Sequence, residues 1–147
     1  MTQTKSALLQ LASSSRLLNE VSDQLSQQLV EIENSINRFN LGVTADVILR
    51  TVDASTDTQP ITAVDELRYR KHQGKWALVW VSYVNEDPEV TWQEKLLRES
   101  PREIRLLAVK KLPALLAELV KKTDDLAAET ADMAIEAGEL AAALNGQ

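Results

Sequence analysis

The sequence has no cysteine and a single histidine, His72, among its 147 residues. Disulfide scaffolds, cysteine nucleophiles and Cys/His zinc sites are therefore excluded. The four glycines, at positions 42, 74, 138 and 146, are isolated from one another, so neither a glycine-rich phosphate loop nor a GxSxG nucleophile elbow is present. We expect no cofactor, no metal ion and no enzymatic activity, because every common catalytic signature is missing.

Long apolar runs are also missing. The longest, such as residues 76–81, are far shorter than the ~20 residues that a membrane-spanning helix needs, and no signal-peptide core follows Lys5. An apolar share of 44% in 147 residues is enough to bury a hydrophobic core. We therefore expect one cytoplasmic domain over residues 1–147, without membrane association.

The prolines and the aromatic residues are confined to the middle of the chain. The four prolines stand at positions 60, 88, 101 and 113, and all three Trp, both Tyr and the single Phe lie between positions 39 and 92. Two long segments without proline flank this centre. This distribution predicts a compact head between two helical arms.

Residues 5–40 and 113–145 are each predicted to form one of these arms, because apolar residues recur at alternating spacings of three and four. The two stripes match in length, at ~48 Å each for a rise of ~1.5 Å per residue. We expect the arms to pack as an antiparallel coiled coil or helical bundle. If they pair within one chain, the layers run from Leu8/Leu144 to Phe39/Leu112, but a pairing between chains would show the same spacing.

Further apolar residues widen both stripes beyond a two-helix seam, so we expect a homodimer or a higher homo-oligomer. The partner of such an assembly is a second copy, with another protein as a further partner. The predicted interface residues are Leu11, Leu18, Leu25, Leu29, Ile32, Leu116, Leu119, Leu126, Met133 and Leu140.

Residues 41–86 are predicted to form a three-stranded antiparallel meander, since their pattern is rich in β-branched residues and partly alternating. Gln73-Gly74 reads as a two-residue hairpin turn that sets His72 opposite Lys75. With that register the core face of the hairpin is Leu67, Tyr69, Trp76, Leu78 and Trp80.

Residues 87–112 are predicted to form short helices. Helix-start signals stand at Asp87-Pro88 and at Ser100-Pro101, and Pro113 predicts a kink or a short break before the C-terminal arm. The predicted fold class is therefore α+β: a long N-terminal helix, a three-stranded sheet, two short helices and a long C-terminal helix.

Basic residues gather on the predicted hairpin, next to two aromatic rings, and suggest contacts to nucleic acid or another anion. They are Arg68, Arg70, Lys71 and Lys75. Two observations oppose this interpretation: strand alternation directs the arginines away from the rings, and the chain carries a formal net charge of -6. His72 lies beside a turn with little to orient it, so we expect no catalytic role for it.

The sequence thus favours a non-enzymatic interaction, scaffold or assembly protein that self-associates through long amphipathic helices. One alternative is a nucleic-acid-associated protein that uses the hairpin at 68–75. Another is a small-ligand binder or enzyme with a pocket lined by Trp76, Trp80 and Trp92.

Overall fold

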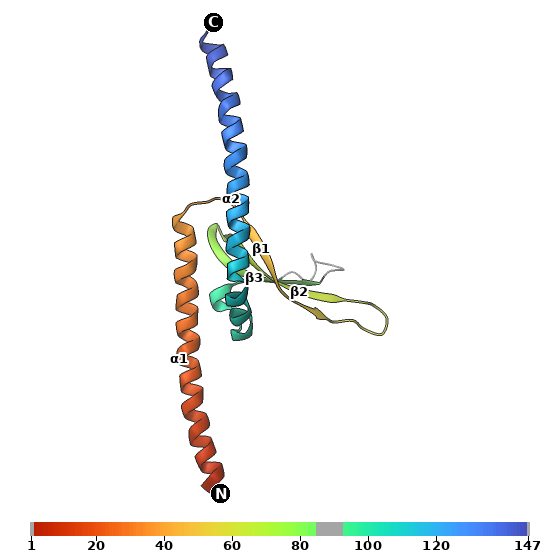
Figure 1. The fold of residues 1–147 in the computed structure, drawn as a ribbon. Helices are drawn as coiled ribbons and strands as arrows, with labels where there is room; N and C mark the ends of the chain where they lie inside the picture. Colours follow the sequence, from red (N-terminus) through yellow and green to blue (C-terminus); the bar gives the residue numbers. More distant parts are fainter. Residues whose placement is uncertain (1, 85–92, 147) are drawn as a thin grey trace.

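The computed structural model describes residues 2–84 and 93–146, which form two long helices and one antiparallel sheet (Figure 1). In chain order the elements are α1 (Thr2–Arg38), β1 (Ala45–Asp53), β2 (Thr62–His72), β3 (Lys75–Val84), β4 (Gln93–Leu96), the 3-10 helix η1 (Leu97–Glu99) and α2 (Arg102–Asn145). The predicted α+β class and both long helices are confirmed.

The sheet is a meander with the strand order β1-β2-β3-β4. Every predicted pair of the β2–β3 hairpin is confirmed, beginning with His72 opposite Lys75. Gln73 and Gly74 both have positive φ, 52° and 83°, as a two-residue type I′ turn requires. The turn chemistry therefore sets the register of the hairpin.

Residues 93–99 differ from the prediction. Instead of a short helix, Gln93–Leu96 form a fourth strand, which pairs with β3 from Ser82 to Val79, and Leu97–Glu99 form η1. The predicted start of that helix, residues 87–92, lies outside the described residues. A segment of four residues is too short for periodicity to distinguish a helix from a strand, and here pairing along β3 favours the strand.

Helix α2 also differs, because the second predicted short helix and the C-terminal arm are one continuous helix through Pro113. Proline removes one helical hydrogen bond, to the carbonyl of Val109, at a cost of about 3 kcal/mol. Both residues are exposed, so water can bind the freed carbonyl. Burial of the neighbouring Leu112 and Leu115 in the core offsets the remaining cost.

The two helices run in the same direction and are staggered along their length (Figure 1). Arg105 in the first turns of α2 donates to Ser22 near the middle of α1, with Nη1 2.8 Å from the carbonyl oxygen and Nη2 2.8 Å from Oγ. The termini lie at opposite ends of the molecule. Antiparallel pairing of the arms within one chain, with layers from Leu8/Leu144 to Phe39/Leu112, is therefore wrong. The reason is that β4 and η1 return the chain to the middle of α1 before α2 begins.

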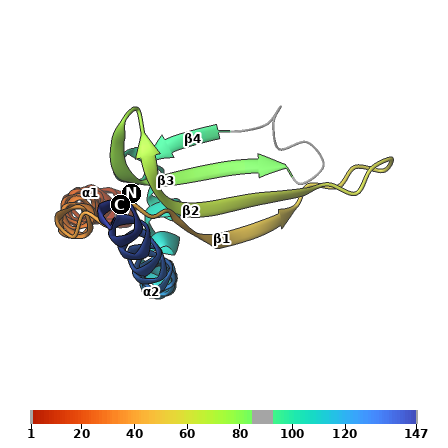
Figure 2. The ribbon, with the colours of Figure 1, turned by 90° about the horizontal axis from the view of Figure 1, so that it is seen from above.

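Both helices pack on the same face of the sheet (Figure 2). The predicted core face is confirmed: Leu67, Tyr69 and Leu78 are buried, and Trp76 and Trp80 pack partly buried against the same cluster. The helices contribute Leu29 and Ile36 from α1 and Ile104, Ala108, Leu112, Leu115 and Leu119 from α2.

Helix α1 completes an edge of β3. The ladder between β3 and β4 ends at Val79, so the strand beyond it has no β4 partner. There Glu33 Oε1 accepts the Leu78 N–H at 2.7 Å, and Asn37 Nδ2 donates to the Trp76 carbonyl at 3.1 Å. Glu33 and Asn37 are four residues apart, a rise of ~6 Å along α1. Leu78 and Trp76 are two residues apart, or ~6.8 Å along β3, so the two side chains match the spacing of the two backbone groups.

We expect Glu33→Ala to lower the free energy of unfolding by about 1–3 kcal/mol, because it leaves the buried Leu78 N–H without an acceptor. Glu33→Gln keeps a side-chain oxygen at this position and is expected to retain most of the stability. Urea denaturation followed by circular dichroism measures both, with Asn34→Ala as an exposed control on the same helix. Equal losses for the Ala and Gln variants would show that the charge, and not the hydrogen bond, stabilises this contact.

Candidate interaction surfaces

Each long helix has one half that is exposed throughout. Every residue of 2–21, which we call the α1 free half, is exposed, and so is every residue of 124–145, the α2 free half. Their large apolar side chains are 42% to 75% exposed. These side chains are Leu8, Leu9, Leu11, Leu17, Leu18 and Val21 in the first and Leu126, Met133, Ile135, Leu140 and Leu144 in the second.

The predicted interface residues divide into two groups. Six are exposed, namely Leu11, Leu18, Leu116, Leu126, Met133 and Leu140. The other four belong to the chain's own core, where Leu29 and Leu119 are buried and Leu25 and Ile32 pack against them. On α1 the change from exposed to covered falls between Leu18 and Leu25. On α2 the change back to exposed falls between Leu119 and Leu126, and Leu116 is exposed within the covered part.

An apolar cavity of about 250 Å³ lies where the end of α1 meets the middle of α2. Ile36, Leu116 and Val120 line it together with Phe39, whose side chain is 72% exposed. Thr123 Oγ1 is buried at its edge, and among the described residues no hydrogen-bond partner faces it. Exposed apolar surface thus continues from the end of α1 towards the α2 free half.

The two free halves differ in charge. The α2 free half contains six carboxylates and no Lys or Arg, whereas the α1 free half contains Lys5, Arg16 and Glu20. The formal charges are therefore -6 and +1. A helix with six carboxylates repels a second copy of itself and favours a neutral or basic neighbour.

Carboxylates neutralise the arginines of the hairpin. Arg68 Nε lies 2.7 Å from Glu66 Oε2. Glu94 on β4 lies between Arg70 and His72, with Oε1 3.3 Å from Arg70 Nη1 and Oε2 2.8 Å from His72 Nδ1. His72 is therefore oriented by a carboxylate that the sequence did not indicate. Because β4 was not predicted, neither was the position of Glu94.

Lys71 lies on the opposite face of the hairpin from these arginines. Lys71 Nζ lies 5.9 Å from the ring centroid of Trp76, which in turn stacks on Tyr69 at 5.3 Å on the core face. Lys75 is exposed at the turn. In the part of the chain that the structure describes, the predicted nucleic-acid contacts thus lie on two faces, and the arginine face carries carboxylates.

A polar cleft of about 630 Å³ lies between the hairpin turn, α1 and η1, and its lining includes Lys75, Trp76 and Arg98. Trp80 does not line this cleft, and Trp92 lies outside the described residues. Of the three tryptophans that the ligand-binding hypothesis names, Trp76 alone among the described residues lines this cleft.

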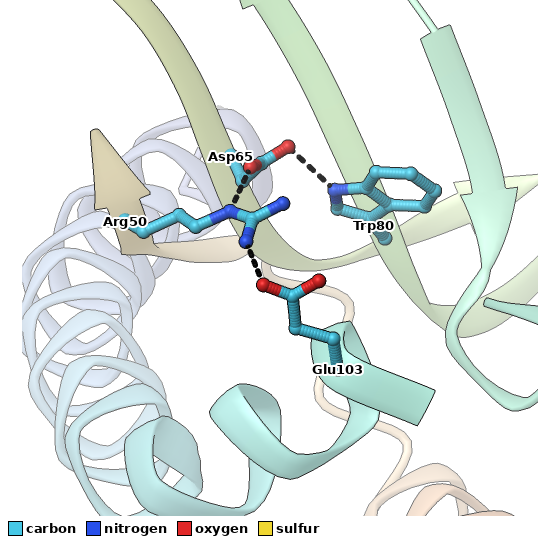
Figure 3. A network of polar contacts seen from close by, with 4 residues as sticks. All are labelled: Arg50, Asp65, Trp80 and Glu103. Atoms are coloured by element: carbon cyan, nitrogen blue, oxygen red, sulfur yellow. Dashed lines mark hydrogen bonds and ion pairs between the residues drawn. The ribbon is translucent and has the colours of Figure 1, made fainter. Parts of the chain in front are cut away.

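Trp80 belongs instead to a network on the core face of the sheet (Figure 3). A β-bulge at Leu49 turns Arg50 towards this face, where its Nε donates to Asp65 Oδ2 at 2.7 Å and its Nη1 donates to Glu103. Trp80 Nε1 donates to the other oxygen, Asp65 Oδ1, at 2.8 Å. The hydrogen bond to Asp65 raises the pKa of Arg50 above its ordinary value. The network ties three strands to the first turn of α2.

The described residues contain no group of three or more His, Cys, Asp or Glu side chains that could hold a metal ion. Nor does the described chain contain a helix that is both long and apolar enough to cross a membrane. No family model, curated protein or solved structure matches this sequence. The function must therefore be inferred from the surfaces described above.

We expect both tyrosines to ionise late. Burial, followed by the charge of Glu33, raises the pKa of Tyr69, and the hydrogen bond to Glu66, followed by burial, raises the pKa of Tyr83. Because the folded-state pKa values exceed the unfolded value of about 10, the contribution of both tyrosines to stability is complete below pH 10 and is lost as the pH rises through the folded-state pKa values.

Tyrosinate absorbance at 295 nm should therefore stay low at pH 10 in the folded protein, whereas the chain in urea is about half ionised. Tyr69→Phe and Tyr83→Phe assign the two groups, and half ionisation of the folded chain at this pH would contradict the prediction.

Proposed function

We propose that this protein is a non-enzymatic scaffold or assembly protein that self-associates through its two long helices. The proposal is carried by the large apolar side chains exposed along both free halves, at the spacing that helices use to pack on each other. Monomeric proteins rarely expose contiguous apolar patches larger than a few hundred Å². Two such stripes, at opposite ends of one chain, favour partner helices at both ends.

The stability of the free halves supports the same proposal. Isolated helices of fewer than about 12–15 residues are marginal in water, and a free half of about 20 residues is only slightly longer. The α1 free half also contains Ser13-Ser14-Ser15, which have a lower helix propensity than alanine. Covering one leucine side chain contributes roughly 1.5–3 kcal/mol, so a partner helix would provide the missing stabilisation.

The sheet and η1 (residues 45–84 and 93–99), which we call the head, hold the two helices in one orientation. Glu33 and Asn37 fix α1 on β3, while Arg105 fixes the start of α2 beside α1. The free halves consequently extend from the head in opposite directions (Figure 1). A rigid element with a binding stripe at each end is suited to joining subunits into an assembly.

Leu11→Glu is expected to weaken self-association, because it sets a charge in the middle of the α1 stripe. Gln10→Glu is the matched control, since it adds the same charge on the same helix where every neighbour three or four residues away is Ser or Ala. By sedimentation velocity over a tenfold concentration range, we expect the unmodified chain and the control to form a multiple of 16.3 kDa, and Leu11→Glu to shift towards 16.3 kDa. An unmodified chain that remains at 16.3 kDa at every concentration would overturn the proposed function.

A further inference from the structure

We infer that two copies associate in opposite directions, so that the α1 free half of each copy packs along the α2 free half of the other. This inference rests on the proposed self-association and names its geometry. Its starting point is the stagger of α1 and α2, which leaves one exposed half at each end of the chain.

The two free halves are matched in length and in place. They contain 20 and 22 residues, or ~30 and ~33 Å of helix. They lie on opposite sides of the segment in which the two helices overlap (Figure 1). A twofold axis perpendicular to the helices therefore brings each α1 free half to the level of the partner copy's α2 free half. Both pairs form at once, and the assembly closes with no free half left over.

Charge selects this pairing over its simplest competitor. If two α2 free halves paired with each other, six carboxylates would face six carboxylates, with no Lys or Arg in either segment. The α1 free half carries Lys5 and Arg16 against Glu20, so it brings a small positive charge to the acidic helix. Like charges across an interface suppress the wrong pairing, which makes the mixed pair the favoured one.

Side-chain size fits the mixed pair as well. When the two free halves run antiparallel with Leu8 level with Leu144, Leu11 meets Leu140 and Leu18 meets Met133. The same register sets Ser15 beside Ala137. Ser15 continues the three- and four-residue spacing between Leu11 and Leu18, and Ala137 continues it between Met133 and Leu140. Large side chains of one helix thus lie opposite large side chains of the other, and the two small residues lie opposite each other.

The absence of cysteine from the sequence makes disulfide trapping unambiguous. An affinity-tagged chain with Ser15→Cys is mixed with an untagged chain with Ala137→Cys and oxidised mildly. Because the two thiols are on separate chains, every mixed disulfide reports a contact between copies. We expect this disulfide to form at least about tenfold faster than the disulfide between two Ala137→Cys chains, a difference that corresponds to about 1.4 kcal/mol.

Two more thiol positions in α1 determine whether the two paired helices run antiparallel or parallel. In the antiparallel pair the preferred partner of Leu11→Cys is Ala141→Cys, and that of Leu18→Cys is Ala134→Cys. The reverse preference, Leu11→Cys with Ala134→Cys and Leu18→Cys with Ala141→Cys, would indicate a parallel head-to-tail chain of copies and would overturn the inference.

The outcomes separate the inference from the proposed function. A multimer that is trapped mainly through two Ala137→Cys residues would preserve self-association and overturn the mixed pairing. An unmodified chain that sediments as a monomer of 16.3 kDa would remove both.

Discussion

The position of α1 depends on two hydrogen bonds to the backbone of β3. Glu33 and Asn37 provide the acceptor and the donor that a further strand residue would otherwise supply to Leu78 and Trp76. Because the partners are backbone groups, this contact fixes the position of α1 along β3. If α1 were shifted by one residue along the strand, it would meet residues whose N–H and C=O groups point towards β2. Since Arg105 in turn joins α2 to Ser22, the same contact sets the height of both helices and therefore the stagger between them.

The features that the sequence predicts are those set by neighbouring residues. The hairpin register follows from Gln73-Gly74, and the core face follows from alternation once that register is known. The presence of the two long helices follows from the apolar spacing, although Pro113 does not mark the start of α2. Each of these inferences uses contacts within a few residues along the chain, or across one turn.

The features that the sequence does not predict depend on distant segments. Leu11 and Leu29 occupy equivalent positions of one stripe, yet the first is 64% exposed and the second 2%. The difference arises because the sheet, η1 and α2 pack against Leu29 and do not extend as far as Leu11. Ser22 is a sequence signal for one of these contacts, because it interrupts the apolar spacing between Leu18 and Leu25 at the residue where Arg105 binds α1. A polar residue in a buried stripe indicates a polar partner, although it does not identify which one.

The basic hairpin illustrates the same difference between composition and position. Counted along the chain, Arg68 and Arg70 belong to a cationic cluster, but in the fold Glu66 and Glu94 lie within ion-pair distance of them. Glu66 is two residues from Arg68 on the same strand and so on the same face, which strand alternation already implies. Glu94 reaches Arg70 only because β4 pairs with β3, and no local pattern carries that information.

The stagger also determines whether the apolar stripes of α1 and α2 can cover each other within one chain. Two antiparallel arms within one chain would have covered each other, and the chain would need no partner for them. With α1 and α2 parallel and offset, the same apolar positions remain matched in length, but in the proposed assembly their partners are on another copy. An intramolecular contact is independent of protein concentration, whereas the proposed contact obeys mass action, so under the proposal covering of the free halves is coupled to assembly. The head would then form at low concentration, and the free halves would gain their packing partners only as copies meet.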